Sequence, residues 1–399
     1  MSQFSCKMHT TEERYYKISQ VLLKTLGLWP YQQSYFTRIH KMLFASLLLT
    51  FILAQLLVFV TTQYNINLLL KILSTVFPIL FVTIKYCYFI IQANSVKKLL
   101  EQMRDDWKLL KNKLEVIIIE KYVYDIQFFS ITSIVIGFLS LLLLTILQCL
   151  PFILDIILPL NESRPFRMFI ITEYFINQEK YIYIILLHEI LACSIALIAF
   201  YGTLMTLVTY VWHACALFKI ASYHIENAVE KSALAILERQ NLFCQRIIYA
   251  VFIHRRAIEF TNLLASSFTV LFAILIFVGV SSLSLCLFQF RQLITLTYNM
   301  IDILIFAFLI FMQLAYMFIT NYAGQMVIDH GTKLFQAIYN GMWYAAPLHT
   351  QKILLFIMQK VAVNINLGYS SIFALSLKGF TTLVNAAVSY FLMIYSLRE

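Results

Sequence analysis

Seven long apolar segments constrain this chain more than any other feature of its sequence. Each has at least twenty residues and few charged side chains, the length that an α-helix needs to cross a bilayer. The segments are 42–61, 68–93, 126–148, 184–210, 263–290, 298–322 and 366–397. Hydrophobic residues make up 61% of the chain and charged residues 13%, so no soluble packing could bury this surface. The sequence predicts an all-α, polytopic membrane protein with seven transmembrane helices.

Polar segments between the spans are predicted to lie in water. Residues 94–125 are dense in mixed charge, and residues 212–262 hold two polar helical stretches that suggest a hairpin outside the bilayer. Residues 149–183 contain three prolines, which predicts a long loop with room for short helices.

The last span has a polar line along one side of a single, uninterrupted helical period. Its members recur at steps of four, three, four and seven, which places them on one narrow strip: Lys378, Thr382, Asn385, Ser389 and Ser396. A polar strip on a spanning helix cannot face lipid. Two interpretations are open: hydrogen bonding between packed helices, or the wall of a pore formed by several copies of this helix.

The segment before this last span is too polar to cross a bilayer as an ordinary helix. Within residues 324–363 the run 352–358 is apolar at helical spacing, so we expect a short half-helix beside the membrane. Asn364, Asn366 and Gly368 are then expected to break the rod before the final span.

The charge pattern predicts the orientation in the membrane. The net charge of +10 is spread over loops, and most of the 30 Lys and Arg residues fall before the first span or after the second, fourth and sixth. Positive loops stay in the cytosol, so we expect the N-terminus inside and the C-terminus outside. The glycosylation sequon at Asn161 falls in the loop then predicted to lie outside, although sequons also occur by chance.

The sequence gives no support for an enzyme, a metal site or a cofactor. The seven cysteines are scattered and show neither a disulfide framework nor metal-ligand spacing. His188 and Glu189 begin a zinc motif that Ala192 leaves incomplete. Charge spread over loops also speaks against nucleic acid as a partner.

Several short motifs, most of them in the last third, resemble those of insect odorant receptors. They are Leu26–Tyr31, Tyr322–Gly324, Ala337–Tyr344, Pro347, Leu354–Lys360, Leu375–Leu377, Phe380 and Ser389–Phe391. The chain looks like a ligand-tuned subunit of hymenopteran type and not like the co-receptor. A rhodopsin-like receptor is disfavoured, because the third span ends without Asp-Arg-Tyr and the seventh lacks Asn-Pro-x-x-Tyr.

The resemblance implies an odorant-gated, non-selective cation channel in the plasma membrane of sensory dendrites, a heterotetramer with the co-receptor. It divides the chain into a cytosolic amphipathic segment (1–41), helices one to six (42–323), cytosolic anchor helices (212–262 and 324–365) and a pore-lining helix (366–399). Met393 and Leu397 would form a hydrophobic constriction beside Ser396, which can gate by dewetting. Lys378 stands where the family usually has an acid; it either faces the pore and repels cations, or snorkels to the interface.

The resemblance also implies a ligand pocket in the outer half of the bundle, between spans two and six, for a small hydrophobic odorant. The candidate contacts are Phe77, Phe81, Thr145, Cys149, His188, Ala192, Tyr298, Asp302 and Phe306. For each of these residues taken singly, plain packing is the more common role. Asp302 and His188 draw most interest, because ionisable groups at membrane depth are costly without a partner, unless they lie at the headgroup level.

Other functions stay open from the sequence. A gustatory-type chemoreceptor channel, a G-protein-coupled receptor and a transporter are alternatives. The identity of the odorant and the subunit stoichiometry are not encoded in any motif that we recognise.

Overall fold

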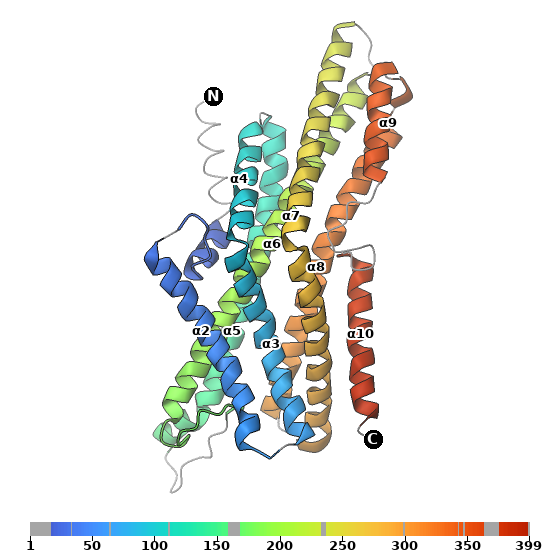
Figure 1. The fold of residues 1–399 in the computed structure, drawn as a ribbon. Helices are drawn as coiled ribbons and strands as arrows, with labels where there is room; N and C mark the ends of the chain where they lie inside the picture. Colours follow the sequence, from blue (N-terminus) through green and yellow to red (C-terminus); the bar gives the residue numbers. More distant parts are fainter. Residues whose placement is uncertain are drawn as a thin grey trace.

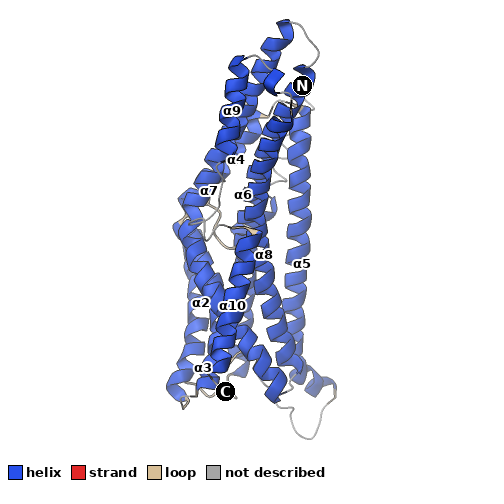
Figure 2. Cartoon of the chain, turned by 90° about the vertical axis from the view of Figure 1, so that its right-hand side faces the viewer, coloured by secondary structure: helices blue, strands red, loops and turns tan. Residues whose placement is uncertain are grey.

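Long helices lying side by side form the molecule (Figures 1 and 2). The computed structural model describes residues 17–32, 34–63, 65–110, 112–158, 168–232, 237–297, 300–341, 343–345, 348–362 and 375–397, and these contain no strand. The main helices are α2 (Tyr35–Thr61), α3 (Ile66–Ile91), α4 (Ala93–Leu109), α5 (Lys113–Ile157), α6 (Ile182–Ser232), α7 (Leu237–Gln292), α8 (Met300–Asn340), α9 (Leu348–Ala362) and α10 (Leu377–Ser396).

The prediction of seven spanning helices is confirmed. Among the described residues, seven helices are long and apolar enough to cross a membrane: α2, α3, α5, α6, α7, α8 and α10. The seventh apolar region is also split as expected, because α9 and α10 are separate helices.

Helix α6 is the centre of the bundle, packed against α2, α3, α5, α7 and α8. Its hydroxyl side chains have no water to bond, and Thr203, Thr206 and Thr209 instead donate to backbone carbonyls four residues earlier, at 2.7 Å each. This internal bonding lets a helix that carries polar groups be buried on most of its surface.

The longest helices extend beyond any bilayer. Helix α6 has 51 residues and α7 has 56, which at about 1.5 Å per residue is about 75 Å or more, against a hydrocarbon core of about 30 Å. Together with α4, α9 and the beginning of α5, they form a second layer at the end of the bundle away from the C-terminus (Figure 1). The two polar stretches of 212–262 are helical in their described residues, as predicted. That 94–125 and 212–262 lie in water stays a prediction.

Two predicted boundaries were wrong. The loop expected from Cys149 begins later, because α5 continues through Pro151 to Ile157; a proline in a long helix costs one hydrogen bond and need not end it. The final helix, expected to be uninterrupted from Asn366, begins at Leu377 after a bend at 375–376, and the Ser376 hydroxyl accepts the Gly379 N–H at 3.0 Å. Residues 363–374, including the expected break, lie outside the described residues.

A buried ion-pair cluster joins α4, α6 and α7 in the layer away from the C-terminus. The Asp106 carboxylate bonds His213 Nε2 at 2.9 Å with one oxygen and accepts from Arg256 Nε with the other. The side chains of Asp106 and His213 are 1% and 0% exposed, and that of Arg256 is 23% exposed. A buried carboxylate shared by a guanidinium and an imidazole resists removal of any one partner, because the others are then left without their buried hydrogen-bond or ion-pair partner.

Helix α8 holds the beginning of α10. The Asn321 side chain accepts the Ser376 N–H and the Gln325 side chain accepts the Leu377 N–H, both at 3.3 Å. Between these two residues lies Gly324, where a Cβ atom would be 2.1 Å from the Leu375 carbonyl oxygen. The two segments therefore touch backbone to backbone, which only glycine permits at this position.

Replacing Gly324 by alanine should destabilise the protein by about 1–3 kcal/mol, because backbone and not a flexible side chain must move. The matched control is Gly202→Ala, whose added Cβ meets the Leu26 methyl group Cδ1 at 2.8 Å. That methyl can turn aside, and alanine favours the helix. We expect a lower midpoint of thermal unfolding in detergent micelles for Gly324→Ala only; equal midpoints would contradict the close contact.

Candidate ligand cavity and pore helix

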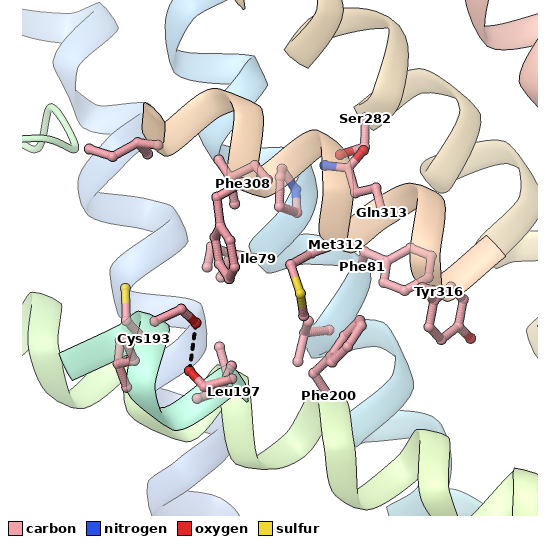
Figure 3. Close-up of a pocket in the computed structure, with 18 of the residues that line it drawn as sticks. Ile79, Phe81, Cys193, Leu197, Phe200, Ser282, Phe308, Met312, Gln313 and Tyr316 are labelled. Atoms are coloured by element: carbon pink, nitrogen blue, oxygen red, sulfur yellow. Dashed lines mark hydrogen bonds between the residues drawn. The ribbon is translucent and has the colours of Figure 1, made fainter. Parts of the chain in front are cut away.

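A cavity of about 210 Å³ lies inside the bundle, lined by α3, α5, α6, α7 and α8 (Figure 3). Its walls are almost wholly apolar, with Phe81, Phe200, Phe308 and Met312 among the largest side chains. We call it the inner cavity. Apolar burial contributes about 25 cal/mol per Å² to binding, so such walls suit a small hydrophobic molecule.

A second cavity of about 150 Å³ adjoins the first on the side toward the C-terminal end of the bundle. The two share seven lining residues, Pro78, Ile79, Leu141, Leu144, Cys193, Ile305 and Leu309. We call this one the outer cavity. It is more polar, because Lys71, Glu189 and Asp302 line it, and Glu189 accepts a 2.9 Å hydrogen bond from Gln148. Phe169 and Ile170 of the segment before α6 also line it.

Four of the nine predicted ligand contacts line these cavities. Phe81 lines the inner one, and Thr145, Asp302 and Phe306 line the outer one. Of the others, Phe77, Cys149, His188 and Ala192 line neither cavity, and Tyr298 lies outside the described residues, as does Asn161.

The rotation of α6 about its axis explains why His188 and Ala192 miss the cavities. Glu189 and Cys193 line the cavities, and each is one residue further along the helix than His188 and Ala192 respectively. One residue turns a helix by about 100°. His188 has partners elsewhere: its Nδ1 bonds the Tyr174 hydroxyl at 2.7 Å and its Nε2 bonds Thr50 at 3.2 Å.

Lys85 on α3 is a buried cation behind the wall of the inner cavity. Its side chain is fully buried, and its Nζ lies 4.4, 5.1 and 5.9 Å from the ring centroids of Tyr316, Phe200 and Phe81. Within the described part of the chain, Nζ has no hydrogen-bond partner. Cation–π contacts of a desolvated cation contribute about 2 kcal/mol or more each and offset part of a burial cost of several kcal/mol. They satisfy none of the three N–H donors.

Lys85 is not among the residues that the sequence analysis singled out, because Asp302 and His188 drew the attention there. The sequence did contain a reason to single out Lys85, since a lysine inside a 26-residue apolar helix is as exceptional as Asp302 or His188.

The polar strip of α10 points away from the rest of the chain. Lys378, Thr382, Asn385, Ser389 and Ser396 are all exposed. Ala387, on the opposite side of the helix, is 0% exposed and packs with Val280, Leu283 and Met317. Apart from Thr382, which also lines a cavity between α10 and α7, the strip makes no helix packing within the described part of its own chain. Met393 and Leu397 are also exposed, at 52% and 78%.

Helix α10 is attached to α7 and α8 along its length. The Ser284 hydroxyl donates to the Ala387 carbonyl at 2.9 Å, and the Arg291 guanidinium lies 3.5 Å from the centroid of the Tyr395 ring. Met317 both lines the inner cavity and packs in the cluster with Ala387. One side chain thus contacts the cavity and the outermost helix, which gives a direct path between them.

In the described ranges, no three His, Cys, Asp or Glu side chains come together in a group that could hold a metal ion.

Comparison with known proteins identifies a family and two similar structures. The model of the family described as 7tm Odorant receptor matches residues 65–388. The structure of the insect olfactory receptor OR5 from Machilis hrabei in complex with eugenol superposes with a TM-score of 0.79 at 14% identity, covering 96% of this chain and 98% of that one. The same receptor described without eugenol gives a TM-score of 0.77 at 13% identity, covering 96% and 97%. No curated protein sequence matches this chain.

Proposed function

This chain belongs to the 7tm odorant receptor family, and we propose that it is the ligand-binding subunit of an odorant-gated, non-selective cation channel. The ligand is a small, largely hydrophobic odorant held in the inner cavity. One of the similar structures is that of a receptor in complex with eugenol, a molecule of the size class that we propose here.

The observation that carries the channel proposal is the direction of the polar strip on α10. A membrane helix that exposes Asn385 and Ser389 on its outer side needs a neighbour or water there, since lipid cannot satisfy them. A central pore shared by four subunits supplies that water. Met393 and Leu397, exposed near the end of the same helix, then form the apolar ring that closes the pore by dewetting.

Ligand binding is coupled to this pore through α8. The helix supplies Phe308, Met312 and Tyr316 to the inner cavity, and further along it Asn321 and Gln325 bond the beginning of α10. A ligand that displaces α8 therefore moves the base of the pore helix. Packed elements of this kind shift between discrete arrangements and do not deform continuously.

The rest of the assembly follows the family. The partner is the odorant receptor co-receptor, in a heterotetramer in the plasma membrane of sensory dendrites. The N-terminus lies in the cytosol and the C-terminus outside, with 212–262 and 324–365 forming the cytosolic anchor. Lys378 is exposed in the first turn of α10; in a heteromer the co-receptor offsets its repulsion of cations.

Recording from excised membrane patches tests the proposal. Cells that co-express this chain with the co-receptor should give odorant-evoked cation current in patches without nucleotides, and cells with the co-receptor alone should not give it for the same odorants. A response that requires GTP would instead indicate coupling through a G protein. Absence of any current across a broad odorant panel, with both proteins detected at the surface, would overturn the proposal.

A further inference from the structure

We propose that the inner cavity selects odorants that carry a carboxylate, with Lys85 as the group that recognises it. This inference rests on the proposed function and adds to it a chemical class of ligand. The inference starts from a charge that the described part of the chain leaves uncompensated.

The environment of Lys85 lacks an anion. Its ammonium is fully buried on α3, and the described residues offer it no carboxylate within ion-pair distance and no hydrogen-bond acceptor. What surrounds it is aromatic, since rings from α3, α6 and α8 lie within 6 Å of Nζ. Ring faces stabilise a cation but cannot accept its N–H donors in the directional way that an oxygen can. An oxygen anion from outside the chain would supply what is missing.

The same three rings form part of the cavity wall. Phe81, Phe200 and Tyr316 all line the inner cavity and gather toward one end of it (Figure 3). Lys85 is therefore separated from the ligand space by a single layer of side chains. The Tyr316 hydroxyl in this layer is also buried without a hydrogen-bond partner among the described residues, so two donors without acceptors lie at one end of the cavity.

The rest of the cavity wall suits the apolar end of an odorant that carries a carboxylate. Leu141, Leu144 and Leu197 also line the inner cavity, and Leu141 and Leu144 lie on the side shared with the outer cavity, which none of the three rings lines. These leucines offer an alkyl chain only dispersion contacts. A ligand with a hydrocarbon tail and one carboxylate matches this division. The carboxylate oxygens would accept hydrogen bonds from the Lys85 ammonium and the Tyr316 hydroxyl. The ion pair between the carboxylate and Lys85 would form at low dielectric, where it is strong.

Recognition at this end would also act on the pore helix. Tyr316 is the ring nearest to Nζ, and it belongs to α8, next to Met317 of the cluster that packs on α10. A carboxylate that enters between Tyr316 and Lys85 has to move the tyrosine. The same event would then both bind the ligand and displace the helix that holds α10.

The test compares three ligands of one chain length: nonanoic acid, 1-nonanol and methyl nonanoate. Their dissociation constants are measured by displacement of labelled nonanoic acid from the full-length receptor with its co-receptor in nanodiscs. Wild type should bind the acid more tightly than either neutral compound. Lys85→Met should weaken the acid roughly ten- to hundredfold, the range for a lost charged hydrogen bond, and leave 1-nonanol within about threefold. Lys85→Arg should keep the preference.

Lys71→Met is the matched control, because Lys71 lies on the same helix but lines the outer cavity. It should leave the ratio of acid to alcohol binding unchanged. The inference is overturned if wild type binds acid and ester equally, or if Lys71→Met and not Lys85→Met removes the preference. The wild-type comparison and Lys85→Arg keep the test decisive if Lys85→Met does not fold.

Two further arms separate related outcomes. The carboxylate comes either from an added acid or from a membrane fatty acid, and a wash with fatty-acid-free albumin separates the two sources. The response to added acid survives the wash. The basal current changes after the wash only if a membrane fatty acid was bound. Binding of nonanoic acid without evoked current would sustain this inference and contradict the channel proposal. Current evoked by neutral odorants with no preference for acids would do the reverse.

Discussion

A positively charged thiol reagent should block the odorant-evoked current of Ser389→Cys and leave that of Ala387→Cys unaffected. Both positions are on α10 two residues apart, but Ser389 is exposed on the polar strip, whereas Ala387 is 0% exposed against α7 and α8. A fixed positive charge in a narrow cation pathway repels the ion that it must pass. We expect the current of the Ser389 variant to fall by roughly tenfold or more.

The experiment is a whole-cell recording with the co-receptor, before and after the reagent, with unmodified receptor as the background for the natural cysteines. Block of both variants would mean that the effect does not depend on which side of α10 is modified. Block of neither, with surface expression confirmed, would place the strip away from the conduction pathway. The co-receptor then would line the pore alone. Scanning Met393 and Leu397 in the same way locates the narrowest point.

Asp106→Asn should be the most destabilising single change outside the membrane spans. It leaves the Arg256 guanidinium and His213 without their shared carboxylate in a buried site. Breaking one partner out of a buried ion pair costs about 3–5 kcal/mol, and we place this case near the lower figure of about 3 kcal/mol, because Arg256 is partly exposed and keeps some hydration.

The adjacent residue is the control. Asp105 pairs with Lys108 at 3.1 Å, but both side chains are more than half exposed. An exposed pair contributes about 0–1 kcal/mol, so Asp105→Asn should barely change stability. Thermal unfolding of both variants in the same detergent, followed by tryptophan fluorescence, measures the difference. Equal melting temperatures would mean that the Asp106 cluster contributes no more than a surface pair.

The bundle could be predicted from sequence because bilayer thickness sets the length of its elements. Seven apolar segments gave seven helices, and the polar stretches of 212–262 are helical where the structure describes them. That 94–125 and 212–262 lie in water stays a prediction. The ends of helices were harder to predict next to Pro151 and Ser376. Pro151 did not end α5, because a helix of 45 residues has many other hydrogen bonds that hold it together. Nothing in the apolar pattern before Leu377 indicated that Ser376 would cap a new helix.

The ligand site was harder to predict, because it depends on helix rotation. Phe81, Thr145, Asp302 and Phe306 line the cavities, yet His188 and Ala192 miss them by one residue on α6. Apolar residues cover nearly the whole surface of these helices, so periodicity does not say which side faces a cavity. Lys85, by contrast, could have been singled out from the sequence, since its charge is out of place at any rotation.

The attachment of α10 to its own chain bears on how such receptors can vary. Gly324 fixes one end of the helix, Ser284 bonds its middle, and Arg291 stacks on Tyr395 near the other end. A pore wall anchored in this way presents a neighbouring subunit of the proposed assembly with the hydroxyl and amide groups of the strip together with exposed apolar side chains such as Leu392 and Met393. In the proposed assembly, the cavity behind α8 could then diverge among related chains to suit new volatile compounds, while every one of them remained interchangeable around a common partner.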